Sequence, residues 1–75
     1  MKAYKNDRGY ILAVFKNDDG LYQIYRRPDI YSDFSMINKR IMPKKTREEA
    51  ERDLDIYIGY MARSTYKLID FKGDM

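Results

Sequence analysis

The chain has 75 residues and a mass of 9.1 kDa, its composition is 44% apolar and 36% charged, and its formal net charge is +3. A chain this short buries only about 60% of its unfolded surface, so it has room for a single small domain with a limited core. Because Cys, His and Trp are absent, neither disulfides nor a Cys/His zinc site supplies stability, and we expect one α+β domain over residues 1–75 held together by aliphatic and aromatic side chains.

A β-hairpin is the first element that the sequence predicts. The runs Tyr10 to Lys16 and Leu21 to Arg27 are rich in aromatic and β-branched residues, and the Asn-Asp-Asp-Gly sequence between them suits a tight turn. With a loop of two or four residues, one face carries Ile11, Ala13, Phe15, Tyr22, Ile24 and Arg26. The other face carries Tyr10, Leu12, Val14, Leu21, Gln23, Tyr25 and Arg27. Both faces of the first strand are thus apolar, whereas a small antiparallel sheet usually has one wet face.

The sequence after the hairpin predicts a loop followed by a third strand. Pro28 ends the second strand because it has no N–H to donate to the sheet. We expect the residues from Asp29 to Ser35 to form a loop or a single helical turn with aromatic anchors. From Met36 to Met42 the apolar residues have a weak period of two, which predicts the third strand.

One helix is predicted from Thr46 to about Arg63, followed by a closing strand from Tyr66 to Phe71. Thr46 and Glu49 form a capping box, in which the Thr46 hydroxyl accepts a bond from the Glu49 N–H and the Glu49 side chain accepts one from the Thr46 N–H. At about 100° per residue, the stripe that faces the sheet consists of Ala50, Leu54, Tyr57, Ile58 and Met61. The fold class is therefore α+β, with a small three- to four-stranded antiparallel sheet, an N-terminal β-hairpin and one α-helix packed on a face, in the order β-β-β-α-β.

The composition disfavours catalysis and metal binding. No His or Cys is available to exchange protons or to coordinate a metal near neutral pH. Asp53 and Asp55 lie about 200° apart on a helix, so their carboxylates do not converge on one ion. The acidic turn at residues 17–20 lacks the spaced ligands of a calcium loop. We expect no enzyme activity, no cofactor, no metal site and no small-molecule substrate.

The sequence also predicts that the protein is located in the cytoplasm. The longest apolar run, Tyr10 to Phe15, is far shorter than the ~18 residues that a membrane span requires. The first eight residues are polar and do not resemble a targeting segment. A small domain without Cys is typical of a reducing compartment. We therefore expect a cytoplasmic protein that does not bind a membrane.

Basic residues near the predicted sheet support a nucleic-acid-binding hypothesis. They are Arg26, Arg27, Lys39, Arg40, Lys44 and Lys45, and Tyr22 and Tyr25 lie among them as stacking surfaces. A short three-stranded sheet followed by a helix that opens with Thr-Arg-Glu-Glu-Ala-Glu resembles the N-terminal arm-binding domain of tyrosine integrases, over about Gly9 to Tyr60. The resemblance implies that the sheet enters the DNA major groove. The same Lys and Arg side chains also suit a sheet border that prevents pairing with other chains.

A protein-binding hypothesis rests on apolar residues that the core does not need. Ile56 and Tyr60 lie four residues apart on one side of the helix, about 120° from the core stripe and beside Gly59. Leu12 and Tyr25, on the second apolar face of the hairpin, extend this candidate surface. The alternative is that a strand or a loop covers these residues.

We favour a small non-catalytic protein-binding module that acts by surface contact. Such a module is an adaptor or inhibitor of the kind that phages and mobile elements often encode. Its partner is another protein, or a second copy of the chain in a homodimer. The alternative is a sheet-based nucleic-acid-binding domain with DNA as its partner.

Overall fold

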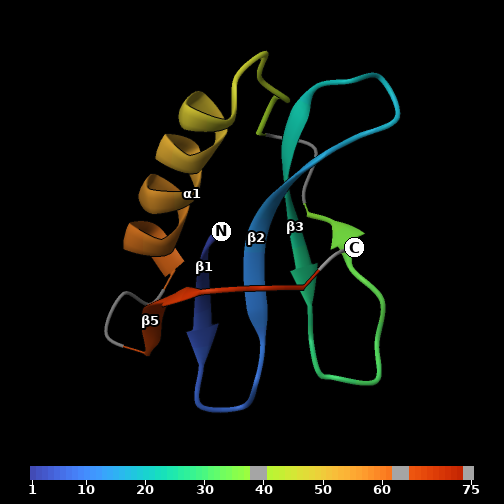
Figure 1. Ribbon diagram of the computed structural model, residues 1–75. Helices are drawn as coiled ribbons and strands as arrows, with labels where there is room; N and C mark the ends of the chain where they lie inside the picture. The colour runs from blue at the N-terminus through green and yellow to red at the C-terminus, as the bar shows by residue number, and fades with distance from the viewer. Residues whose placement is uncertain (38–40, 62–64, 74–75) are drawn as a thin grey trace.

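A computed structural model describes residues 1–37, 41–61 and 65–73. The described elements are β1 (Lys2–Asn6), β2 (Ile11–Lys16), β3 (Tyr22–Arg27), β4 (Ser35–Met36), α1 (Arg47–Met61) and β5 (Tyr66–Asp70). The strands form one five-stranded antiparallel sheet in the order β4-β3-β2-β1-β5, and α1 lies on one side of it, against β2 and β3 (Figure 1). The α+β class, the hairpin and the single helix are confirmed, with one more strand than predicted.

The additional strand is β1, and a turn that repeats later in the chain connects it to β2. Asn6-Asp7-Arg8-Gly9 and Asn17-Asp18-Asp19-Gly20 share the pattern Asn-Asp-x-Gly. In each turn the Asn side-chain oxygen accepts two backbone N–H bonds of 2.9 and 3.0 Å. The glycines adopt φ values of 84° and 79°, a left-handed conformation that glycine reaches without a Cβ clash. The chain therefore contains two β-hairpins in succession.

The faces of the predicted hairpin were assigned wrongly, and the turn explains why. Asn17 and Leu21 pair with each other, since the Asn17 N–H donates to the Leu21 carbonyl at 2.7 Å. Only the residues at 18–20 remain in the loop, and an odd loop length reverses the parity that a loop of two or four residues would give. Leu12 lies opposite Arg26 and Val14 opposite Ile24.

The predicted third strand is wrong at Ile37, Ile41 and Met42, which are described and do not belong to a strand. Among the described residues of this segment, Ser35–Met36 forms the strand β4 beside β3, and Lys44 later forms an isolated bridge with Tyr22. Ile37 and Ile41 instead turn inward and pack on the core beneath the helix. Residues 38–40, which fall within the predicted strand, lie outside the described residues.

The helix begins where its cap predicts. The Thr46 hydroxyl accepts the predicted bond from the Glu49 N–H, at 3.3 Å. The Glu49 carboxylate accepts a bond of 2.9 Å from the Thr46 hydroxyl, whereas the prediction had the Thr46 N–H as its donor. Arg47 donates to the Val14 carbonyl at 2.8 Å, which ties the first turn to β2. The helix is neither long nor apolar enough to cross a membrane, as is true of all helical structure in the described residues.

One core lies between α1 and the sheet. The predicted stripe is confirmed for Ala50, Leu54 and Ile58, which are buried, while Tyr57 is half-buried at the margin. The sheet contributes Leu12, Val14 and Ile24. The side chain of Met61, predicted in the same stripe, lies outside the described residues.

A second, smaller core covers the opposite face of the sheet. Its buried members are Ala3, Ile11, Ala13, Phe15 and Tyr25. Phe34, from the loop after β3, packs on Phe15 with ring centroids 4.9 Å apart, and Phe71 follows at 5.7 Å from Phe34. Such edge-to-face aromatic pairs contribute about 0.5–1.5 kcal/mol each beyond the area they bury. Both faces of β2 are apolar because both face a core.

Candidate functional site

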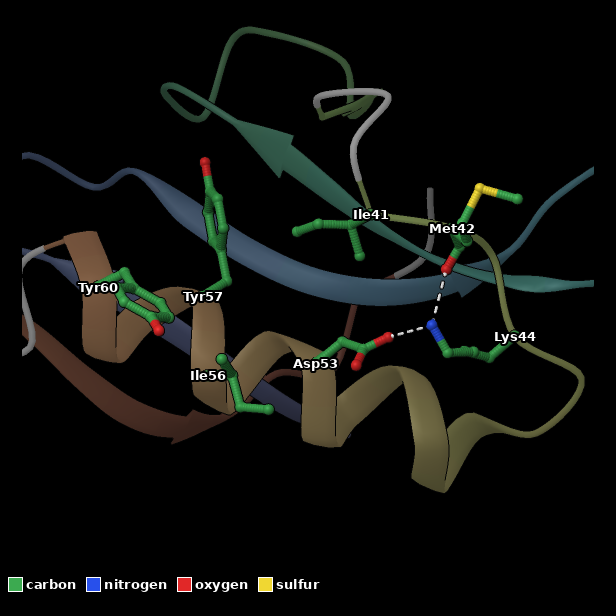
Figure 2. A pocket seen from close by; sticks show the side chains of 7 residues that line it. All are labelled: Ile41, Met42, Lys44, Asp53, Ile56, Tyr57 and Tyr60. Atoms are coloured by element: carbon green, nitrogen blue, oxygen red, sulfur yellow. Dashed lines mark hydrogen bonds and ion pairs between the residues drawn. The ribbon is translucent and has the colours of Figure 1, made fainter.

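An apolar groove of about 620 Å³ lies between α1 and the segment 41–44 that precedes it (Figure 2). We call it the α1/41–44 groove. One wall is the segment, and the other is a stripe of α1. The lining residues are Ile41, Met42, Lys44, Asp53, Ile56, Tyr57 and Tyr60. The four helical members follow the spacing i, i+3, i+4, i+7, so they form a second stripe beside the core stripe.

The groove combines an anchored floor with an exposed rim. Ile41 and Tyr57 are half-buried against the core, and the Ile41 side chain points toward the Tyr57 ring across the groove (Figure 2). Met42, Ile56 and Tyr60 remain 69%, 55% and 88% exposed. Large apolar side chains gathered at such exposure mark contact surfaces more often than scattered ones do.

An ion pair joins the two walls at one end of the groove. The Lys44 ammonium lies 2.7 Å from Asp53 Oδ2 and also donates to the Met42 carbonyl at 3.2 Å. The contact between the Lys44 ammonium and Asp53 Oδ2 is an ion pair without the alignment of a hydrogen bond. The Lys44 backbone is fixed by two bonds to Tyr22, of 2.7 and 2.8 Å. The two charged residues in the lining thus neutralise each other.

Comparisons with family models, curated proteins and solved structures give no match. The function therefore has to be argued from the geometry of the chain itself.

The predicted protein-contact residues divide into three groups. Ile56 and Tyr60 are exposed, as their helical angles predict, and they line the groove. Gly59 is exposed, with no atom within 4 Å of where a Cβ would lie, but it does not line the groove. Leu12 and Tyr25 are only 1% and 7% exposed, so their assignment to a contact surface is wrong.

The burial of these two residues has separate causes. Leu12 lies beneath α1 in the larger core. Tyr25 packs edge-to-face on Phe15 in the smaller core, with ring centroids 5.8 Å apart, and burial raises the pKa of its phenol. The second apolar face of the hairpin is covered by Phe34 and Phe71, so it does not present an open docking surface.

The predicted nucleic-acid residues that the structure describes do not form one basic surface. Arg26 and Arg27 lie on opposite faces of the sheet, because they are neighbours in β3. The Arg26 guanidinium donates to the Tyr10 hydroxyl at 3.1 Å, on the helix side. The Arg27 guanidinium lies 5.1 and 5.5 Å from the ring centroids of Phe34 and Phe71.

The two other described basic residues of this set, Lys44 and Lys45, do not add to a shared surface. Lys44 is paired with Asp53 in the groove, and Lys45 is exposed just before the helix. Lys39 and Arg40 lie outside the described residues.

A second hollow, of about 500 Å³, lies on the other side of α1 and contains the most strongly bonded carboxylate. It is lined by Tyr4, Asp55, Ile56, Ile58 and Tyr66. Asp55 accepts bonds of 2.7 Å from Lys2 and from the Tyr4 hydroxyl. Burial favours a higher pKa for Asp55, but these two bonds outweigh it and hold the pKa below its ordinary value. Asp55 is thus an ionised anchor for the helix.

The described residues also offer no metal centre. No three His, Cys, Asp or Glu side chains among residues 1–37, 41–61 and 65–73 are grouped so that they could hold an ion. The lining of the α1/41–44 groove is mostly apolar. The chemistry that the groove supports is therefore apolar contact.

Two members of the groove, Ile41 and Met42, were not predicted as site residues. Ile41 and Met42 were assigned to a strand, where they would have belonged to the sheet. A signal was present, because Pro43 disfavours continued pairing and the capping box at Thr46 places the helix start close behind. Those two features bring the segment 41–44 alongside the helix that it precedes.

Proposed function

We propose that the chain is a small non-catalytic protein-binding module that holds an apolar segment of a partner protein in the α1/41–44 groove. The observation that carries the proposal is the convergence of Met42, Ile56 and Tyr60, all exposed, on one groove. Met and Tyr are enriched at protein interfaces, where their apolar surface is buried at the centre of the contact. A module of this kind acts as an adaptor or an inhibitor.

The charges of the groove indicate what kind of partner it fits. Lys44 is neutralised by Asp53, so the lining offers no unpaired charge to a phosphate group or to an acidic peptide. The apolar rim instead favours aliphatic or aromatic anchors. An amphipathic helix supplies such anchors along one face and commonly docks in grooves of this type. We therefore infer a partner segment that is amphipathic and presents its apolar face to α1.

The nucleic-acid alternative has less support. Phosphate binding depends on several Lys and Arg side chains that reach one surface. In the described residues Arg26 and Arg27 point to opposite faces, and the hairpin is covered by α1 on one face and by Phe34 and Phe71 on the other.

Affinity capture with matched variants tests the proposal. The bait is the wild-type chain, the groove variant Ile56→Ser/Tyr60→Ser, or the control variant Ile30→Ser/Tyr31→Ser. The control alters two side chains that are 72% and 92% exposed in the loop after β3 and do not line the groove. Each bait is exposed to native lysate with and without nuclease.

The proposal predicts one protein in stoichiometric amount on the wild type and on the control, with or without nuclease, and its loss from the groove variant. Truncation of anchor residues at the centre of an interface typically costs more than 1 kcal/mol of binding. Retention of the same protein by the groove variant would refute the assignment of the site. Capture that disappears with nuclease, together with affinity for random duplex that falls steeply with salt, would favour the DNA alternative.

A further inference from the structure

The two edges of the sheet differ in a way that bears on self-association. The β4 edge is only two residues long, and short edge strands resist pairing with other chains. The β5 edge has five residues, Tyr66–Asp70, without Pro or Gly, and it pairs with β1 on one side only among the described residues. At its centre Leu68 is 60% exposed. An edge of this length with an exposed leucine is open to a further strand.

The backbone groups at this edge follow from the pairing with β1. The Phe71 N–H donates to the Met1 carbonyl at 2.7 Å, and the Met1 amino group donates to the Phe71 carbonyl at 2.8 Å. Bonded and non-bonded pairs alternate along an antiparallel ladder. Ile69 and Lys67 therefore direct their N–H and C=O groups toward β1. The alternate residues of β5 direct these groups outward, and they are Tyr66, Leu68 and Asp70.

The side chains of β5 are complementary to those of a second, antiparallel β5. If Leu68 lies opposite Leu68 of the second copy, each Tyr66 lies opposite an Asp70 and each Lys67 opposite an Ile69. No two like charges are then directly opposed, and the exposed leucines cover each other. In the same register the outward-directed residues of both strands meet, so about six N–H···O bonds form between the copies.

We propose that two copies of the chain associate through their β5 strands, antiparallel about Leu68, to form one continuous sheet. The contact is isologous, because both copies use the same strand and each pair of opposed residues occurs twice, related by a two-fold axis that passes through the Leu68 pair perpendicular to the sheet. Both helices lie on the same face of the joined sheet, since Leu68 and its counterpart share the face that carries Tyr4 and Leu12. The α1/41–44 groove includes no residue of β5, so it stays open in the dimer.

Sedimentation equilibrium over a concentration series tests the dimer with the wild type, three variants of Leu68 and the groove variant Ile56→Ser/Tyr60→Ser. The wild type should form a reversible dimer. Leu68→Pro removes an outward N–H and no bond to β1, so it should fold and raise the dimer dissociation constant by about tenfold or more. Leu68→Lys places two ammonium groups opposite each other and should have the same effect. Leu68→Val keeps the N–H and should still dimerise.

Amide hydrogen exchange supplies an independent readout on the wild type. Dimerisation should slow the exchange of the Tyr66, Leu68 and Asp70 amides, while the Lys67 and Ile69 amides are protected in the monomer as well.

A wild type that stays monomeric over the whole series would overturn the proposal, as would a dimer that Leu68→Pro and Leu68→Lys both leave unchanged. Loss of the dimer in Ile56→Ser/Tyr60→Ser, with Leu68→Lys still dimeric, would overturn it too and place the second copy in the groove. The capture experiment changes residues of the groove, and the dimer experiment changes Leu68 of β5. Either proposal can therefore fail while the other stands.

Discussion

The stability of α1 variants should separate core from surface within one helix. Leu54 is fully buried between the helix and the sheet, so Leu54→Ala leaves a cavity and should cost about 2–5 kcal/mol. Ile56 and Tyr60 lie in the same helix but are 55% and 88% exposed. The double variant Ile56→Ser/Tyr60→Ser removes little buried surface and should cost no more than about 1 kcal/mol.

Urea denaturation at concentrations where the chain is monomeric measures both changes. For two-state unfolding, a shift of the midpoint at constant slope reports the loss of stability directly. In a domain of this size each kcal/mol corresponds to a shift of the melting temperature by about 4–8 °C. If the double variant is destabilised as much as Leu54→Ala, the side chains of Ile56 and Tyr60 belong to the core. They would then not be contact residues at the rim of the groove.

Four further predictions concern the cap, the helix, acid stability and metals. Thr46→Ala removes the N-cap acceptor and should lower the melting temperature by about 4–8 °C. A variant with the same melting temperature as the wild type would show that the cap does not stabilise the domain. Gly59→Ala should stabilise the helix by about 1 kcal/mol because its Cβ meets open space, and a loss of stability would reveal an unseen contact. Asp55 has a lowered pKa because its bonds from Lys2 and Tyr4 outweigh the effect of burial, so its contribution is present above the ordinary pKa of an aspartate and is lost as pH falls through the lowered value. The difference in melting temperature between wild type and Asp55→Asn should therefore shrink on acidification, and a constant difference would contradict this. Chelator should leave the melting temperature unchanged, because the described residues offer no metal cluster; a drop would show a structural metal.

Local sequence signals predicted much of the fold. The Asn-Asp-Asp-Gly turn, the N-cap at Thr46 and the stripe at Ala50, Leu54 and Ile58 each have a short-range physical cause, and each appears in the structure. The closing strand is also confirmed, as β5. These features depend on neighbours in the chain, which a sequence displays directly.

The errors arose where distant segments decide the structure. β1 carries two lysines and a single fully buried residue, Ala3, so it lacks the hydrophobic content of a central strand. The sequence signal that could have predicted β1 was the Asn-Asp-x-Gly motif that follows it, which is repeated in the turn after β2. The smaller core, in which Tyr25 is buried against Phe15, also includes Phe34 and Phe71, which pack on it from a loop and from the far end of the chain. No local sequence pattern predicts that these two side chains pack on this face of the sheet.

The candidate site was predicted in part. Helical angles alone placed Ile56 and Tyr60 outside the core stripe, and their exposure is confirmed. The opposite wall of the groove, with Ile41 and Met42, depends on a segment that returns from β4 to the start of α1. Its path is set by the bridge between Lys44 and Tyr22, a contact between residues far apart in sequence.

Site-specific photo-crosslinking tests the central claim, that a partner protein occupies the α1/41–44 groove. A photoreactive phenylalanine analogue replaces Tyr60 on the rim of the groove or, as the matched control, Tyr31 in the exposed loop. After irradiation in native lysate, the account predicts a covalent adduct with one protein from position 60 and none from position 31. An adduct from position 31 alone, or nucleic acid as the species attached at position 60, would contradict it.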